Sequence, residues 1–162
     1  MPGISVVEDA IKVRLTETIA GVDDLVRSVP KPDGSLVPVP VQVKSYPKKP
    51  SEQTLKSLAA AGAVLARYAG SKFGKKRTSG GITVQDETMF FEVLTIADSL
   101  RAEDAHEGVY EFLEVCKARL MEYKPEGCVD GFELVDVNYL SEKNGAWEYG
   151  LLVSVKTQMV KR

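Results

Sequence analysis

The dipeptide Asn144-Gly145 constrains the fold most, because it stands between two runs in which apolar residues alternate with polar ones. An alternation of period two is typical of a strand with one covered face, and Asn-Gly is preferred in short hairpin turns. The sequence therefore predicts a C-terminal β-hairpin with arms at 132–140 and 147–157 and a turn at 142–145. The apolar positions of the second arm are Trp147, Tyr149, Leu151, Val153 and Val155.

Three further strands are predicted upstream of this hairpin. Residues 82–97 are rich in β-branched and aromatic side chains on both faces, which is typical of a central, covered strand. Residues 63–69 are apolar and follow Gly62, a residue that is costly inside a helix, so we interpret them as a strand. The alternating valines at 39–43 have prolines on both sides, which indicates an edge strand.

Two helices are predicted in the first half of the chain. Residues 6–20 repeat apolar positions at helical spacing, Ser5 and Glu8 form a capping box, and Gly21 is a stop signal. Ser51 is the expected N-cap of a shorter helix ending near Ala61.

A third helix is predicted after a cap signature formed by Asp104 and Glu107. Its expected buried face consists of Val109, Phe112, Leu113, Cys116 and Leu120. The order of elements predicts an α+β fold: a mostly antiparallel β-sheet, flanked by helices on one face, with the C-terminal hairpin. We expect residues 1–162 to form one domain with a Pro-rich loop at about 28–40 and a basic Gly/Ser-rich loop at about 70–81.

Charge is distributed unevenly along the chain, although 21 basic and 23 acidic residues give a net charge of only −2. Residues 44–77 hold nine basic residues and one acidic residue, whereas residues 82–136 hold four basic and fourteen acidic. The near-neutral total disfavours a general nucleic-acid coat, and the asymmetry indicates surfaces made for charged neighbours. The candidate protein-interaction site is the basic loop, with Lys72, Lys75, Lys76 and Arg77.

That basic loop leaves two other interpretations open. Its four cations could bind phosphates, as in a nucleic-acid-binding module, or they could simply be solvated. Aromatic interleaving is limited to Tyr68 and Phe73, which disfavours readout of single strands by stacking.

No set of catalytic residues is recognised, so we expect no enzymatic activity, no cofactor and no metal. His106 is the single histidine, which disfavours a triad or a histidine-based metal site. The segment Gly70 to Lys76 departs from the phosphate-loop spacing, and the pairs Asp23-Asp24 and Glu103-Asp104 fit solvated turns and caps.

The two cysteines, Cys116 and Cys128, fit small buried residues in a reducing compartment. No stretch approaches the length of a membrane span, and the start of the chain lacks a signal peptide, so we expect a soluble protein made in a cytoplasm.

Three segments carry a resemblance to a known family: the run AVLARYAGSKF at 63–73, GVYEFL at 108–113, and NGAWEY at 144–149. With the order of elements, they resemble the small tail-terminator proteins of Mu-like contractile-tailed bacteriophages. The resemblance covers nearly the whole chain.

This resemblance implies a ring, typically of six subunits, that caps the completed tail tube and stops its polymerisation. The implied partners are further copies of the chain, the tail tube and sheath proteins, and the head-side connector, with DNA passing through the lumen and no membrane contact. The implied location is the virion tail or neck, after assembly in the host cytoplasm. A neck or connector protein of the same particle remains the alternative, and a nucleic-acid-binding module is a third.

Overall fold

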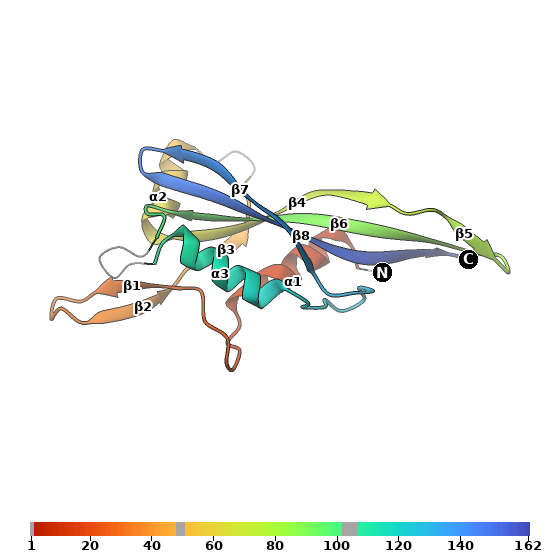
Figure 1. Cartoon of the computed structure of the whole chain (residues 1–162), viewed down its shortest axis with the longest axis horizontal. Helices are drawn as coiled ribbons and strands as arrows, with labels where there is room; N and C mark the ends of the chain where they lie inside the picture. The colour runs from red at the N-terminus through yellow and green to blue at the C-terminus, as the bar shows by residue number, and fades with distance from the viewer. Residues whose placement is uncertain (1, 48–50, 102–106) are drawn as a thin grey trace.

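Two long strands, β6 (Ile82–Ala97) and β8 (Ala146–Lys161), pair antiparallel along almost their whole length and form the centre of the molecule (Figure 1). The structure is a computed structural model, and it describes residues 2–47, 51–101 and 107–162. Within these residues the elements are α1 (Ile4–Thr16), β1 (Val26–Pro30), β2 (Leu36–Pro40), β3 (Gln42–Ser45), α2 (Glu52–Ala61), β4 (Ala63–Phe73), β5 (Arg77–Ser79), β6 (Ile82–Ala97), α3 (Val109–Leu120), β7 (Glu133–Lys143) and β8 (Ala146–Lys161).

The main sheet has the strand order β3-β4-β6-β8-β7, and β5 pairs with β6 beside that path. Only the β3–β4 pairing is parallel among the described strands, so the predicted α+β fold with a mostly antiparallel sheet is confirmed. The predicted C-terminal hairpin is also confirmed. Asn144 and Gly145 both have positive φ, at 53° and 80°, which is the backbone of a type I′ turn.

Helices cover both faces of the sheet rather than one. On one face α1 and α3 pack on β4, β6 and β8, as expected. On the other face α2 packs Leu58 and Ala59 against Leu65, Leu94 and Ile96. The central strands are apolar on both sides at this end, so the second face needs its own cover, and α2 is the exception to the predicted arrangement.

The two ends of α2 position this helix on the second face of the sheet. Ser51 caps the helix as predicted, since its Oγ accepts a hydrogen bond from Thr54 N at 3.1 Å. Gly62 follows with φ of +78°, and a Cβ there would lie 3.0 Å from the Phe112 ring. A glycine is therefore required at the reversal from α2 into β4.

Helix α1 differs from the prediction at both ends. It begins at Ile4 with Gly3 as N-cap, so the predicted Ser5–Glu8 capping box is wrong; Glu8 instead accepts a hydrogen bond from Ser45 Oγ. It ends at Thr16 and not near Gly21, because a buried arginine of α3 binds the carbonyls of its last turn. The predicted core face of Val7, Ile11 and Leu15 is buried as expected.

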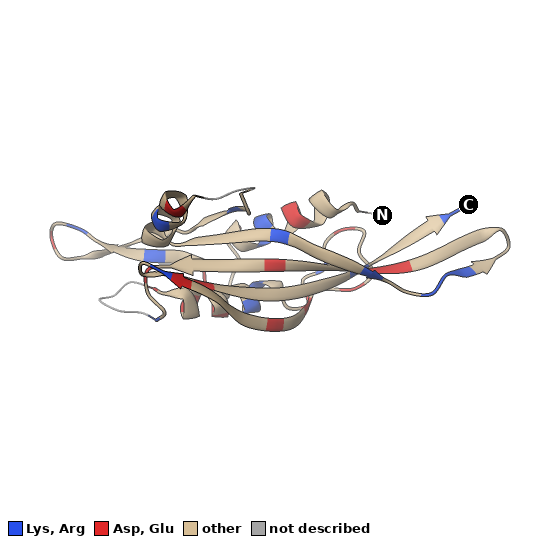
Figure 2. Ribbon diagram, turned by 90° about the horizontal axis from the view of Figure 1, so that it is seen from above, with Lys and Arg blue, Asp and Glu red and all other residues tan. Residues whose placement is uncertain are grey.

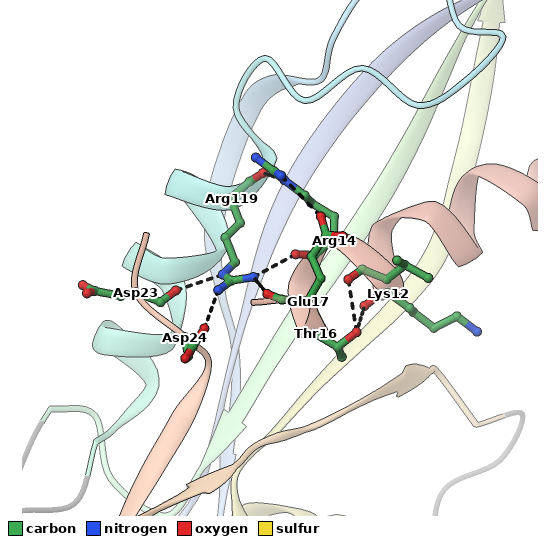
Figure 3. Close-up of polar contacts among 8 residues, drawn as sticks. Lys12, Arg14, Thr16, Glu17, Asp23, Asp24 and Arg119 are labelled. Atoms are coloured by element: carbon green, nitrogen blue, oxygen red, sulfur yellow. Dashed lines mark hydrogen bonds and ion pairs between the residues drawn. The ribbon is translucent and has the colours of Figure 1, made fainter. Parts of the chain in front are cut away.

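That arginine is Arg119, whose side chain is fully buried (Figure 3). Its Nη1 donates to the carbonyl oxygens of Arg14 (3.0 Å) and Glu17 (2.5 Å), and its Nε donates to that of Asp23 (2.9 Å). Its Nη2 pairs with the Asp24 carboxylate at 2.8 Å. One side chain thus joins α1, the segment before β1, and α3.

A second buried arginine, Arg27, joins three other elements. Its Nη1 donates to the carbonyl oxygens of Ala59 and Ala60 at the end of α2, and its Nη2 pairs with Asp98 at 2.5 Å after β6. Both arginines bind mainly backbone carbonyls that a helix end leaves without an intrahelical partner.

The two segments predicted as loops are largely strands. Residues 26–40 form the β1–β2 hairpin, which tolerates its prolines because a two-stranded ribbon has only edge strands. In residues 70–81 the glycines have other roles: Gly70 lies at a bulge in β4, while Gly80 and Gly81, with φ of 57° and 77°, form a two-residue turn between β5 and β6. Only residues 74–76 separate β4 from β5.

The third helix has the predicted core face, with Val109, Phe112, Leu113, Cys116 and Leu120 all buried. Its N-cap is Gly108, and Glu107 instead accepts hydrogen bonds from Ser28 N (2.5 Å) and Ser28 Oγ (2.9 Å). The predicted cap residue Asp104 lies outside the described residues. Cys116 and Cys128 are both buried free thiols, and complete burial raises the pKa of Cys116 to about 12.

Candidate interaction surface

The strands β4, β6 and β8 continue past the helices into a narrow three-stranded extension (Figure 1). We call residues 71–88 and 155–162 the arm, and the rest of the described chain the body. At the base of the arm, Ser71 Oγ donates to the buried Glu87 carboxylate at 2.6 Å and also contacts Tyr68 Oη of the body.

The four predicted site residues, Lys72, Lys75, Lys76 and Arg77, all lie on the arm and are exposed. Strand pairing adds three cations that the sequence interpretation missed: Lys156, Lys161 and Arg162. Lys72 and Lys156 flank Thr88 in the same cross-strand row, and Lys161 lies opposite Thr83. Basic residues of both chain segments occur along the arm, from its base, where Lys72 and Lys156 flank Thr88, towards its far end (Figure 2).

The cations of the arm are only partly neutralised. Arg77 pairs with Asp86 at 3.2 Å, and Lys72 Nζ lies 5.8 Å from the centre of the Phe90 ring. Within the residues that the structure describes, Lys75 and Lys76 form no ion pair. Asp86 and Glu87 are the two carboxylates on the arm, against seven basic side chains.

Apolar side chains are exposed beside these cations. Phe73 is 57% exposed, Ile82 40%, Met159 43% and Val160 51%. Exposed apolar side chains also occur on the body, Val6 and Tyr139 among them. The arm is distinguished by apolar groups that lie beside unpaired cations, a combination suited to binding another protein.

The two charge blocks of the sequence meet inside the subunit, because β4 and β6 are antiparallel neighbours. Arg67 of the basic block pairs with Glu92 of the acidic block, at 2.8 Å from Nε, and its guanidinium lies 4.8 Å from the Tyr46 ring centre. This ion pair neutralises one charge of each block within the subunit.

A groove of about 820 Å³ lies between α3, the segment 21–26 and β2, on the body at the end away from the arm. We call it the acidic groove. Among the described residues, its lining includes five carboxylates and no lysine or arginine. These acidic residues are Asp23, Asp24, Glu107, Glu111 and Glu114, and the apolar lining is provided by Val22, Val26, Pro38, Pro40 and Val115.

The carboxylates of the acidic groove differ in how they are paired. Asp24 is held by Arg119, and Glu114 pairs with Lys117 at 2.5 Å. Burial acts to raise the pKa of Glu107, but its hydrogen bonds from Ser28 prevail and hold that pKa below its ordinary value. No ion pair is found for Asp23 or Glu111 among residues 2–47, 51–101 and 107–162.

The other candidate residues do not form a site. Gly70 to Phe73 is extended strand rather than a phosphate-binding turn. His106, Glu103 and Asp104 lie outside the described residues. Across the part of the chain that the structure describes, no three His, Cys, Asp or Glu side chains lie together as a metal site would need. None of the described helices is long and apolar enough to cross a membrane.

In a comparison with protein families, the family described as Gp37 protein matches residues 35–162. The match covers the arm, the sheet and two of the three helices of the described residues. The chain therefore belongs to the Gp37 protein family, a family of bacteriophage proteins. Among curated proteins, none matches the chain.

Proposed function

We propose that this Gp37-family protein is a tail terminator, a structural protein that forms a ring on the end of the phage tail tube. In this role it stops polymerisation of tube and sheath and provides the joint to the head-side neck. The observation that carries the proposal is the shape and charge of the subunit. A basic arm with exposed apolar side chains projects from one end, and an acidic groove lies at the other (Figure 1).

A subunit of this kind is suited to head-to-tail association, in which one patch contacts a different patch on the next copy. Exposed ion pairs contribute only about 0–1 kcal/mol each, so apolar burial supplies most of the affinity and the charges set the register. The resemblance of residues 63–73, 108–113 and 144–149 to tail terminators supports the same role. The proposed assembly is a hexamer located in the virion tail, and its role requires no catalysis.

The proposed partners are the tail tube protein, the sheath protein and the head-side connector. Purified tube subunits of the same phage should polymerise into tubes of indefinite length alone. With this protein added, they should give shorter tubes with a ring at one end in negative-stain electron micrographs. A strict monomer by light scattering that leaves tube length unchanged would overturn the proposal.

The same particles separate a terminator from a neck connector. A terminator contacts the last tube ring directly. If a virion reconstruction places the chain above the tube–sheath boundary with no contact to a tube subunit, the connector role replaces the terminator role.

A further inference from the structure

We infer that the acidic groove of one subunit is the docking site for the basic arm of a second copy of this chain. This inference rests on the proposed function, which supplies the ring. It adds which two surfaces of neighbouring subunits are in contact in that ring. The arm presents Lys75 and Lys76 without ion-pair partners among the described residues, and the groove presents Asp23 and Glu111 in the same condition.

Charge complementarity is the first argument for this occupant. The arm carries seven basic and two acidic side chains, and the described part of the groove lining has five carboxylates without a lysine or arginine. Two basic arms repel each other, and so do two acidic grooves. Contact between an arm and a groove brings opposite charges together and is therefore the favoured pairing.

Apolar complementarity is the second argument. Phe73, Ile82 and Met159 are exposed on the arm, and the groove offers a lining of valine and proline side chains with Tyr110. A partner that is only a polyanion, such as duplex DNA, would leave these apolar side chains uncovered. The combination of lysines and apolar groups therefore favours a protein groove over phosphates.

Geometry makes the contact intermolecular. The arm and the groove lie towards opposite ends of the long axis of the molecule, so a subunit cannot insert its arm into its own groove (Figure 1). Residues 82–88 of β6 alone extend about 20 Å at the rise of a β-strand, which is enough to cross to a neighbour. Because donor and acceptor surfaces differ, the contact is heterologous, and repeated around an axis it closes a ring.

The test uses charge-reversed variants of the full chain. The arm variant is Lys75→Glu with Lys76→Glu, and the groove variant is Asp23→Lys with Glu111→Lys. The matched control is Lys44→Glu with Lys56→Glu, two exposed lysines on β3 and α2 outside both surfaces. Thermal unfolding of each variant checks that the subunit is folded, and light scattering at low salt measures self-association.

Each of the two test variants should weaken self-association by about tenfold or more, while the control stays at the wild-type value. An equimolar mixture of arm variant and groove variant should recover assembly. In that mixture each wild-type arm finds a wild-type groove, and each acidic arm finds a basic groove. Wild-type assembly of either variant, or a mixture that stays dissociated, overturns the inference.

A gel shift with duplex DNA at low salt distinguishes a nucleic-acid partner. If the arm variant loses DNA retention but assembles as the wild type does, the arm binds phosphates and the inference is wrong. Failure of the proposed function gives a different result from failure of the docking inference. Variants that still form rings on tube ends leave the terminator role intact with a different subunit contact, whereas a wild-type chain that never assembles removes the role itself.

Discussion

The body and the arm are built from the same three strands, but they differ in how far the side chains are buried and how many charged groups are paired. In the body, β4, β6 and β8 are covered on both faces at one end, and its two buried arginines are satisfied by backbone carbonyls. In the arm, Val155 at the base is still buried, but Phe73, Ile82, Met159 and Val160 are exposed. Lys75 and Lys76 of the arm form no ion pair among the described residues. The difference indicates that the body provides most of the stability of the fold, whereas the far part of the arm contributes little to stability and presents its side chains for binding.

The largest predicted difference in unfolding free energy is between alanine variants of two phenylalanines on adjacent strands. Phe91 of β6 is fully buried, and Phe91→Ala should lower the free energy of unfolding by about 3–5 kcal/mol, because it leaves a cavity in the core. Phe73→Ala, at the end of β4 on the arm, should change it by no more than about 0.5 kcal/mol. Urea denaturation of both variants measures the difference; equal losses would contradict the division into body and arm.

The next effect concerns Arg119. Arg119→Met keeps much of the side-chain volume but leaves three backbone carbonyls without their donor, so we expect a loss of about 2–4 kcal/mol in unfolding free energy. The loss of unfolding free energy should be smaller than for removal of one partner of a fully buried ion pair, because Asp24 is half exposed and its carboxylate can be hydrated. A matched control, Arg77→Met on the arm, should leave denaturation unchanged.

A smaller effect on stability should appear when the pH is lowered and Glu107 becomes protonated. Burial acts to raise the pKa of Glu107, but hydrogen bonds from Ser28 outweigh it and hold that pKa below its ordinary value. A lowered pKa means that the ionised group stabilises the folded state, and this contribution is lost as pH falls through the folded-state pKa. The urea midpoint of Glu107→Gln should therefore depend less on pH between about 5 and 3 than the wild-type midpoint. An unchanged pH dependence would show that this carboxylate does not contribute.

The smallest effect on the fold should come from salt. The Debye length falls from about 10 Å at 0.1 M to about 3 Å at 1 M ionic strength, which screens exposed charges of the arm and groove. Assembly should loosen over this range, while the unfolding midpoint of the dissociated subunit stays nearly constant. Light scattering and circular dichroism on the same samples measure the two quantities; unfolding in parallel with dissociation would contradict the account.

Local sequence signals predicted the elements that are fixed by local geometry. The Asn144-Gly145 turn, the strand at 82–97 and the Ser51 cap each depend on residues close together in the chain, and each is present in the structure. The buried face of α3 also follows from spacing alone, because its core residues share one side of a helix.

The predictions that failed depend on partners far away in the sequence. The end of α1 is determined by Arg119, more than 100 residues away, and no local pattern contains that contact. Gly70 and Gly80-Gly81 were interpreted as loop residues, but strand pairing with β6 makes them a bulge and a turn. The three C-terminal cations of the arm became part of the candidate surface only through the β6–β8 register.

The acidic groove could not be predicted for the same reason. Asp23 and Glu111 are 88 positions apart, and they face one groove only because Arg119 ties the segment before β1 to α3. The charge blocks of the sequence did indicate two charged surfaces. Their positions at opposite ends of the subunit needed the structure.

The most direct test of the central claim is an electron cryo-microscopy reconstruction of the assembly that the wild-type chain forms at low salt. The account predicts a closed ring in which residues 72–77 of each subunit contact α3 of the next subunit. A ring whose arms point away from the neighbouring subunits would contradict it.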